Sequence, residues 1–348
     1  MAYTTINKGS DYFNTKLYTG TGATLSITGV GFQPDFVWTK GRNVAFSHYL
    51  MDSVRGVGRR IMSNSTSNED INIFGVSSFD SDGFTLGTDT GANNNGSTFA
   101  SWNWLAANGT ASNTQGSITS TVSANTTSGF SIVSYTGNGS ASATIGHGLG
   151  TSNVGMIITK NRDQPDGWIV YHKSLGANNY LVLQTTDPSD VSANKYLSVP
   201  TSTTYEIGNS GDMNTNTEAY IAYCFAEVKG FSKFGKYDGN AGVGAFVNNF
   251  QHLGFKPAFV MIKCYNAAES WNVFDNKRNG YNYQNDYLIP NDTNAEVSAP
   301  NQGIDLLSNG FNPYYGTGTI NRSGKSYIYM AFAENPFVGS DGTPTTAR

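Results

Sequence analysis

The chain has 348 residues and a formal net charge of -4, and only 13% of its residues are charged. No basic run is present that could follow a phosphate backbone, which excludes nucleic acid as an expected partner. No apolar run approaches the roughly 18 residues of a membrane span, and residues 1–5 do not begin a signal peptide, so we expect no membrane insertion. The 40 glycines and the short aromatic runs are typical of a β protein.

The first segment contains a series of short strand patterns. A strand that begins near Phe13 ends in a turn at residues 20–22, because glycine accepts positive φ at low cost. Residues 36–40, which follow Pro34, form an almost wholly apolar run that predicts a strand covered on both faces. Residues 99–104 alternate aromatic and small side chains, which indicates a half-buried strand.

The same patterns recur twice more in the same order. The apolar run returns in residues 155–160 and 254–263, and the alternating strand returns in residues 220–225 and 327–332. Each copy is about 100 residues long, which is the size of a β-sandwich, and so long a period favours three separate sandwiches over a solenoid. Each apolar run ends in a lysine: Lys40, Lys160 and Lys263. We expect all three to be surface charges at strand ends, with pairing to neighbouring carboxylates as the alternative.

These copies define the predicted fold class and domains, which are an all-β chain with three tandem β-sandwich repeats. Repeat 1 is expected in residues 1–109, repeat 2 in residues 130–230 and repeat 3 in residues 231–337. Residues 110–129 are rich in Ser, Thr, Asn and Gly, and they are expected to form a linker or an edge strand. Residues 338–348 are expected to form a C-terminal tail. Repeats 2 and 3 join directly, so this pair should be the more rigid one.

The sequence lacks the motifs that are typical of catalysis. It contains no Gly-x-Ser-x-Gly elbow, no Walker sequence and no Cys-x-x-Cys, and its four histidines have no metal-ligand spacing. We therefore expect no enzyme and no cofactor. Cys224 and Cys264 lie in apolar runs, which predicts two buried thiols in a reducing cytosol, with a disulfide as the alternative. Glu227 and Glu334 follow the last strands of two repeats and are expected to form capping or rim ion pairs.

Two polar stretches have both a structural and a functional interpretation. Asp80 and Asp82 resemble the start of a calcium loop but lack the later ligands of an EF-hand. A turn whose Asp side chains bond their own backbone is therefore favoured over a structural calcium site. His147 lies between glycines in residues 146–150, and we assign it to a glycine-rich loop rather than a phosphate cradle, because no helix follows it.

Several motifs resemble those of repeat-containing structural proteins of tailed, mostly marine, bacteriophages. They are Tyr-Thr-Gly-x-Gly at 135–139, Gly-His-Gly-Leu-Gly at 146–150, Trp-x-Val-Tyr-His at 168–172, Tyr-x-Ala-Tyr-x-Phe-Ala-Glu at 220–227 and Gly-Phe-Ser-Lys-Phe-Gly at 230–235. The resemblance covers nearly the whole chain and is best in repeats 2 and 3. It implies lectin-like, concanavalin-type jelly-roll modules, as in tail fibres and virion decoration proteins, and it supplies no catalytic residue.

The resemblance implies a virion protein that is made in the host bacterial cytoplasm. Other virion proteins are the implied partners, together with a homo-oligomer, for which a trimer is favoured. A tail-fibre component that binds a host glycan is the first hypothesis, because loops rich in Asn, Gly, Ser and Tyr suit carbohydrate. The alternatives are a capsid decoration or head-fibre protein and a polysaccharide-degrading enzyme on the same scaffold. The candidate ligand-binding loop residues are Asn93, Asn94, Asn95, Asn178, Asn179, Tyr180, Tyr281 and Tyr283.

Overall fold

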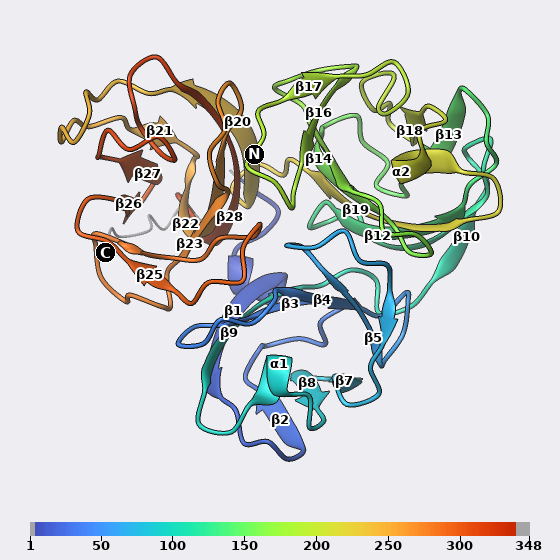
Figure 1. Cartoon of the computed structure of the whole chain (residues 1–348), viewed down its shortest axis with the longest axis horizontal. Helices are drawn as coiled ribbons and strands as arrows, with labels where there is room; N and C mark the ends of the chain where they lie inside the picture. The colour runs from blue at the N-terminus through green and yellow to red at the C-terminus, as the bar shows by residue number, and fades with distance from the viewer. Residues whose placement is uncertain (1–3, 339–348) are drawn as a thin grey trace.

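The computed structural model describes residues 4–338 and shows the all-β protein that the sequence predicts. Helix is limited to single turns: η1 (Gly9–Asp11), α1 (Thr90–Asn93) and α2 (Gly211–Asn214). Figure 1 shows three lobes around a common centre, which we call unit 1 (residues 4–106), unit 2 (residues 107–227) and unit 3 (residues 228–338). The predicted tail at 338–348 lies outside the described residues except for Val338, and the predicted domain boundaries stay predictions.

Short antiparallel strands make up every unit. Unit 1 contains β1 (Phe13–Thr19), β2 (Leu25–Thr28), β3 (Phe36–Gly41), β4 (Tyr49–Asp52), β5 (Arg59–Met62), β6 (Asp70–Ile71), β7 (Val76–Asp80), β8 (Gly83–Leu86) and β9 (Thr98–Trp104). Unit 2 contains β10 (Ala111–Asn113), β11 (Ser120–Asn125), β12 (Phe130–Thr136), β13 (Ala143–Gly146), β14 (Val154–Asn161), β15 (Trp168–His172), β16 (Asn179–Val182), β17 (Asp190–Val191), β18 (Thr204–Ile207) and β19 (Ala219–Ala226). Unit 3 contains β20 (Ser232–Asp238), β21 (Gln251–His252), β22 (Phe255–Cys264), β23 (Asn272–Asp275), β24 (Asp286–Tyr287), β25 (Val297–Ser298), β26 (Ile304–Leu307), β27 (Gly310–Pro313) and β28 (Ser326–Pro336).

The same order of four strands occurs in the main sheet of each unit. It is β1-β9-β3-β4 in unit 1, β12-β19-β14-β15 in unit 2 and β20-β28-β22-β23 in unit 3. In each case the first strand of this set of four pairs with the last strand of the unit, which then pairs with the apolar strand. Residues 110–129 contain two strands of this sheet: β11 pairs with β12 along its whole length, and β10 pairs with β11 and forms the edge.

Each main sheet is buried on both faces. One face packs against a small sheet of the same unit, as Val37 and Met51 of unit 1 do against Phe84 of β8. The opposite face points to the centre of the molecule, where residues of all three units form one continuous hydrophobic cluster. Every residue of β3 and β14 is therefore buried, as the apolar runs predict. Units 1 and 2 each also have a hydrophobic cluster of their own between the main sheet and the small sheet, and the central cluster joins all three units.

One expectation about the strand ends is wrong. Lys40, Lys160 and Lys263 are not surface charges, because all three side chains are buried. Their ammonium groups donate to backbone carbonyls, and two of these bonds cross between units: Lys40 Nζ donates to Thr293 O at 3.1 Å, and Lys263 Nζ donates to Thr186 O at 2.8 Å. A buried ammonium group is tolerated when it is fully hydrogen-bonded, and here these bonds join neighbouring units.

Candidate functional site

The candidate residues of unit 1 lie around α1, and only one of the three is fully exposed. Asn93 is buried, and its amide accepts a bond from Thr21 N and donates to Ala23 O and Gly87 O. Asn94 is half-buried, and Asn95 is exposed. Asn93 therefore holds the loop from inside, and Asn95 is the side chain of this stretch that faces solvent.

The candidate residues of unit 2 lie where β16 begins. Asn178 is exposed, whereas the Asn179 side chain donates to the carbonyls of Leu175 and Ala177 and so fixes the preceding turn. The Tyr180 hydroxyl donates to Asp190 Oδ2 at 3.0 Å, and its ring lines a hollow beside that aspartate. Burial, followed by this hydrogen bond, raises the pKa of Tyr180 to about 12. The phenol thus remains a neutral donor at physiological pH.

The candidate residues of unit 3 lie next to a group of aromatic rings. Tyr281 is 82% exposed, and the Tyr283 ring lies 6.3 Å from the Tyr315 ring. Phe246 stands edge-on to Tyr315 at 5.3 Å and stacks on Tyr314 at 4.5 Å, while 59% of its own surface remains exposed. We call Phe246, Tyr281, Tyr283 and Tyr315 the aromatic surface of unit 3.

Three separate loops supply the aromatic surface. Phe246 comes from the connection between β20 and β21, Tyr283 from the connection between β23 and β24, and Tyr315 from the segment after β27. Tyr281 and Tyr283 are predicted from the sequence, whereas Phe246 and Tyr315 are not. Aromatic residues inside the Gly- and Asn-rich stretch 239–250 are the sequence signal that points to Phe246, since a core strand would not carry so many turn residues.

The remaining candidate positions have structural partners. Asp82 accepts the N–H groups of Gly29 and Gly31, which lower the pKa of its carboxyl, and Asp80 accepts the Thr85 hydroxyl. None of these bonds is to the backbone of the aspartates' own turn, which is what the favoured interpretation expects: Asp82 holds the loop after β2, and Asp80 holds a side chain of β8. His147 is buried and its Nδ1 accepts Leu149 N, so its loop also has a structural explanation.

Two further predictions are confirmed by the contacts. Glu227 forms an ion pair with Lys173, and Glu334 forms one with Lys256. Cys224 and Cys264 are buried free thiols, and burial raises the pKa of both, which keeps them protonated and unreactive.

The fold is that of an all-β protein whose three lobes each contain a main sheet with the same order of four strands and together contribute to one central hydrophobic cluster (Figure 1). The chain belongs to the family described as Domain of unknown function (DUF7483), whose model matches residues 8–336 and thus spans all three units. No curated protein matches the sequence. Within residues 4–338, no helix has the length and apolar character needed to span a membrane, and no cluster of three or more His, Cys, Asp or Glu side chains could hold a metal ion.

Proposed function

We propose that this chain is a non-catalytic structural protein of a bacteriophage virion and that it binds a host-surface glycan. The observation that carries the glycan part is the aromatic surface of unit 3, where Phe246 and Tyr281 expose most of their rings. Aromatic side chains at protein surfaces offer a flat apolar face that suits the C–H face of a sugar ring. The virion part rests on the motifs that resemble phage structural proteins.

The residues beneath the aromatic surface hold its rings in fixed positions, which suits the binding of a glycan. Phe246 is supported from below by Tyr314, whose ring is almost parallel to it with an interplanar angle of 11°. The Tyr283 hydroxyl donates to Pro300 O at 2.6 Å, so this ring is also fixed before any ligand arrives. Rings held in place in the free protein lose little conformational entropy on binding, which favours affinity for a weakly held ligand such as a sugar.

A glycan array with the purified chain tests this proposal. We expect binding to a subset of bacterial surface glycans and a loss of about tenfold or more in affinity for Phe246→Ala, because one stacking contact is worth about 1–2 kcal/mol. Phe74→Ala is the matched control, since Phe74 is exposed to a similar degree in unit 1. Equal binding by both variants would contradict the assignment of the site. Release of oligosaccharides from the glycan would instead support the enzyme alternative.

A second candidate function is a capsid decoration or head-fibre protein, and a different surface favours it. Val57, Ile71, Ile73 and Phe74 are exposed in unit 1, and Ile71 lies in β6, the last strand of its sheet. An exposed apolar patch at a sheet edge is typical of a contact with another protein. Labelling of intact particles distinguishes the two functions: signal over the head with none on the tail supports decoration, and Ile71→Lys should then reduce incorporation.

The proposal includes assembly with other virion proteins and into a homo-oligomer, for which a trimer is favoured. Repeated binding surfaces in one particle would raise the avidity for a glycan without any new contact. Mass photometry of the purified chain and of the disassembled particle checks this. Particles that yield only monomers of this chain would remove the homo-oligomer from the proposal.

A further inference from the structure

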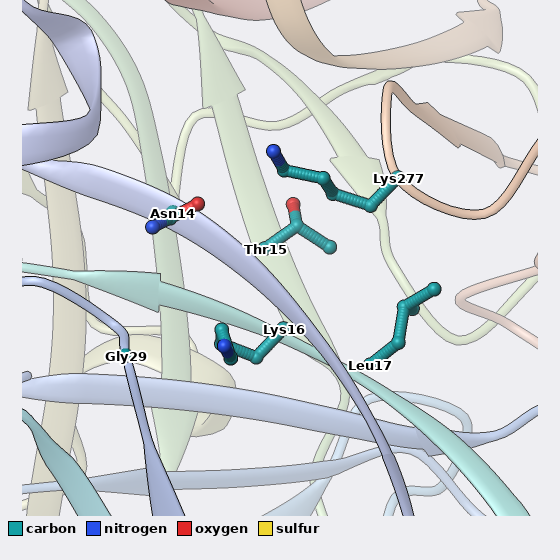
Figure 2. A pocket seen from close by; sticks show the side chains of 6 residues that line it. All are labelled: Asn14, Thr15, Lys16, Leu17, Gly29 and Lys277. Atoms are coloured by element: carbon teal, nitrogen blue, oxygen red, sulfur yellow. The ribbon is translucent and has the colours of Figure 1, made fainter. Parts of the chain in front are cut away.

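A hollow of about 320 Å³ lies where unit 1 meets unit 3. It is lined by Asn14, Thr15, Lys16 and Leu17 of β1, by Gly29, and by Lys277, which follows β23. Figure 2 shows the Thr15 hydroxyl pointing toward the Lys277 side chain, with Lys16 on the other side of β1 near Gly29. We call this feature the seam hollow.

The seam hollow exists because a large side chain is absent from this position of unit 1. Thr15 pairs with Trp102 of the last strand, and the residue at the corresponding position of unit 3 is Phe234, which pairs with Met330. Phe234 fills the corresponding space: it touches the His172 ring of unit 2, and a Cβ on Gly155 would collide with it. Replacement of a phenyl ring by a threonine leaves room at the seam and exchanges an apolar contact for polar groups.

Three of the polar side chains around the seam hollow, those of Thr15, Lys16 and Lys277, lack a polar partner within residues 4–338. Thr15 is 3% exposed, and its hydroxyl has no hydrogen-bond partner among the described residues. Within the same part of the chain, the ammonium groups of Lys16 and Lys277 have no carboxylate within ion-pair distance. Asp82 is the carboxylate that Lys16 influences, but both of its oxygens already accept backbone N–H groups. A buried hydroxyl without a hydrogen-bond partner lowers the stability of the free protein. Such a cost is expected at a site where a bound ligand supplies the missing partner.

We infer that the seam hollow binds a carboxylate-bearing saccharide unit. The ammonium group of Lys277, on the Thr15 side of β1, supplies the positive charge for the carboxylate, and Lys16 adds positive charge from the other side of the strand (Figure 2). Asn14 Nδ2 donates to Val30 O, which leaves its Oδ1 to accept a sugar hydroxyl, and the Thr15 hydroxyl is free to donate or accept. Leu17 offers an apolar contact for the ring. The volume falls within the range of small-ligand sites, at roughly 300–1,000 Å³.

This site is distinct from the aromatic surface of unit 3. It is built from β1 and the turn after β23, whereas the aromatic surface comes from the loops around β21, β24 and β27. Loss of binding at one site should leave the other intact. Failure of the glycan proposal at Phe246 is thus distinguishable from failure of this inference.

Titration calorimetry of the full chain with sodium glucuronate tests the inference, with glucose and inorganic phosphate as comparison ligands. We expect glucuronate to bind, glucose to bind at least tenfold more weakly, and added salt to weaken the glucuronate affinity. Lys277→Gln should reduce that affinity about tenfold, the value of one charge-assisted hydrogen bond, and Lys16→Gln should reduce it by less, because Lys16 lies on the other side of β1 (Figure 2). Lys236→Gln, on an exposed lysine of β20, is the matched control and should change nothing.

Two threonine variants complete the design. Thr15→Val keeps the shape of the side chain and should weaken glucuronate binding, whereas Thr15→Phe should fill the seam hollow as Phe234 does in unit 3 and abolish binding. If the Thr15→Phe variant does not fold, the glucuronate affinities of the Thr15→Val and Lys277→Gln variants still test the inference. Equal affinity for glucuronate in wild type and Lys277→Gln would overturn the inference. Phosphate binding as tight as glucuronate binding would overturn the saccharide assignment.

Discussion

Three buried asparagines hold the loops that follow β1, β12 and β20, one in each unit. Asn93 accepts Thr21 N, Asn214 accepts Asn138 N and Asn321 accepts Asn240 N, with distances of 2.8 to 3.2 Å. Each also donates to carbonyls of that loop or its neighbours. A single side chain therefore satisfies several backbone groups that no strand reaches, which explains why a polar residue is buried at this position.

Asn93→Ala should lower the free energy of unfolding by about 2–3 kcal/mol, because it leaves one backbone N–H and two carbonyls without partners in a buried place. Asn95→Ala is the control, because Asn95 is exposed. This variant should change the free energy of unfolding by less than about 0.5 kcal/mol. Urea unfolding followed by tryptophan fluorescence measures both. A similar loss in the two variants would mean that the loop, and not the buried amide, sets the stability.

The three buried lysines make stability depend on pH. Burial, partly offset by nearby carboxylates or a neighbouring thiol, lowers the pKa of Lys40, Lys160 and Lys263 from 10.5 to about 8. The unfolded chain binds more protons than the folded chain between these two values, so stability rises with pH across this window. The cost of the buried charge is present below about pH 8 and is relieved as the folded-state amine loses its proton.

Lys263→Met removes one of these titrating groups. The stability of wild type relative to this variant should increase by about 2 kcal/mol between pH 8 and pH 10, since only wild type gains from deprotonation. Urea unfolding at pH 7, 8, 9 and 10 provides the measurement, and Lys236→Met on the exposed face of β20 is the control with no pH trend. A constant difference across the range would show that Lys263 does not titrate in the folded protein.

At the scale of elements, the units meet through one repeated contact between the end of an apolar strand and a hairpin loop. Arg42 of unit 1 pairs with Glu296 of unit 3, and Arg162 of unit 2 pairs with Glu69 of unit 1. A backbone bond accompanies each pair, and a third backbone bond joins Ser189 to Tyr265. The end of the apolar strand of unit 1 thus contacts unit 3, that of unit 3 contacts unit 2, and that of unit 2 contacts unit 1. The three contacts together form a closed ring.

Glu69 is the most connected carboxylate of these contacts. It accepts bonds from Arg162 on both oxygens and further bonds from Arg55 and Arg59. The arginines outweigh the opposing effect of burial and lower the pKa of Glu69 to about 2. Its contribution to stability is therefore complete above about pH 4.5 and is lost as pH falls toward 2.

Glu69→Gln should lower the free energy of unfolding by about 3 kcal/mol at pH 7, because it leaves the buried Arg55 with one partner fewer. The loss should shrink as pH falls from 4 to 2, where wild-type Glu69 is protonated as well. A double-mutant cycle with Arg162→Met measures the coupling across the contact. Glu206→Gln on the surface of β18 is the control, and a coupling near zero would show that the ion pair does not join the units.

The elements of this fold are readable in the sequence, whereas the contacts between units are not. The apolar runs and the alternating final strands predict β3, β14 and β22 and their partners, since burial on both faces leaves a continuous apolar pattern. The acceptor of Lys263 lies 77 residues away, and that of Lys40 lies 253 residues away. No local pattern reports such a partner, so a lysine at a strand end looks like a surface charge. The aromatic surface was predicted only in part for the same reason.

At the scale of the whole molecule, three aromatic rings mark the centre of the ring of units. Trp104, Phe225 and Phe332 occupy matching positions in the last strands β9, β19 and β28. Their ring centroids are 6.0, 5.7 and 5.8 Å apart, so they form a nearly regular triangle. Each unit supplies one of the three rings, and unfolding of any one unit would expose the rings of the other two. The three units should therefore unfold together.

Phe225→Ala tests this cooperativity, because it opens a cavity at the point that all three units share. We expect a loss of about 3–5 kcal/mol, as for other buried phenylalanines, and a single unfolding transition at a lower urea concentration. Hydrogen exchange resolved by peptide should show faster exchange in β9 and β28 as well as in β19, since the neighbouring units lose packing too. Ile207→Ala, in β18 and within the separate hydrophobic cluster of unit 2, is a control whose effect on exchange should be largest in unit 2. Faster exchange confined to unit 2 in the Phe225→Ala variant would mean that the units are energetically separate and that the central cluster joins them without coupling their unfolding.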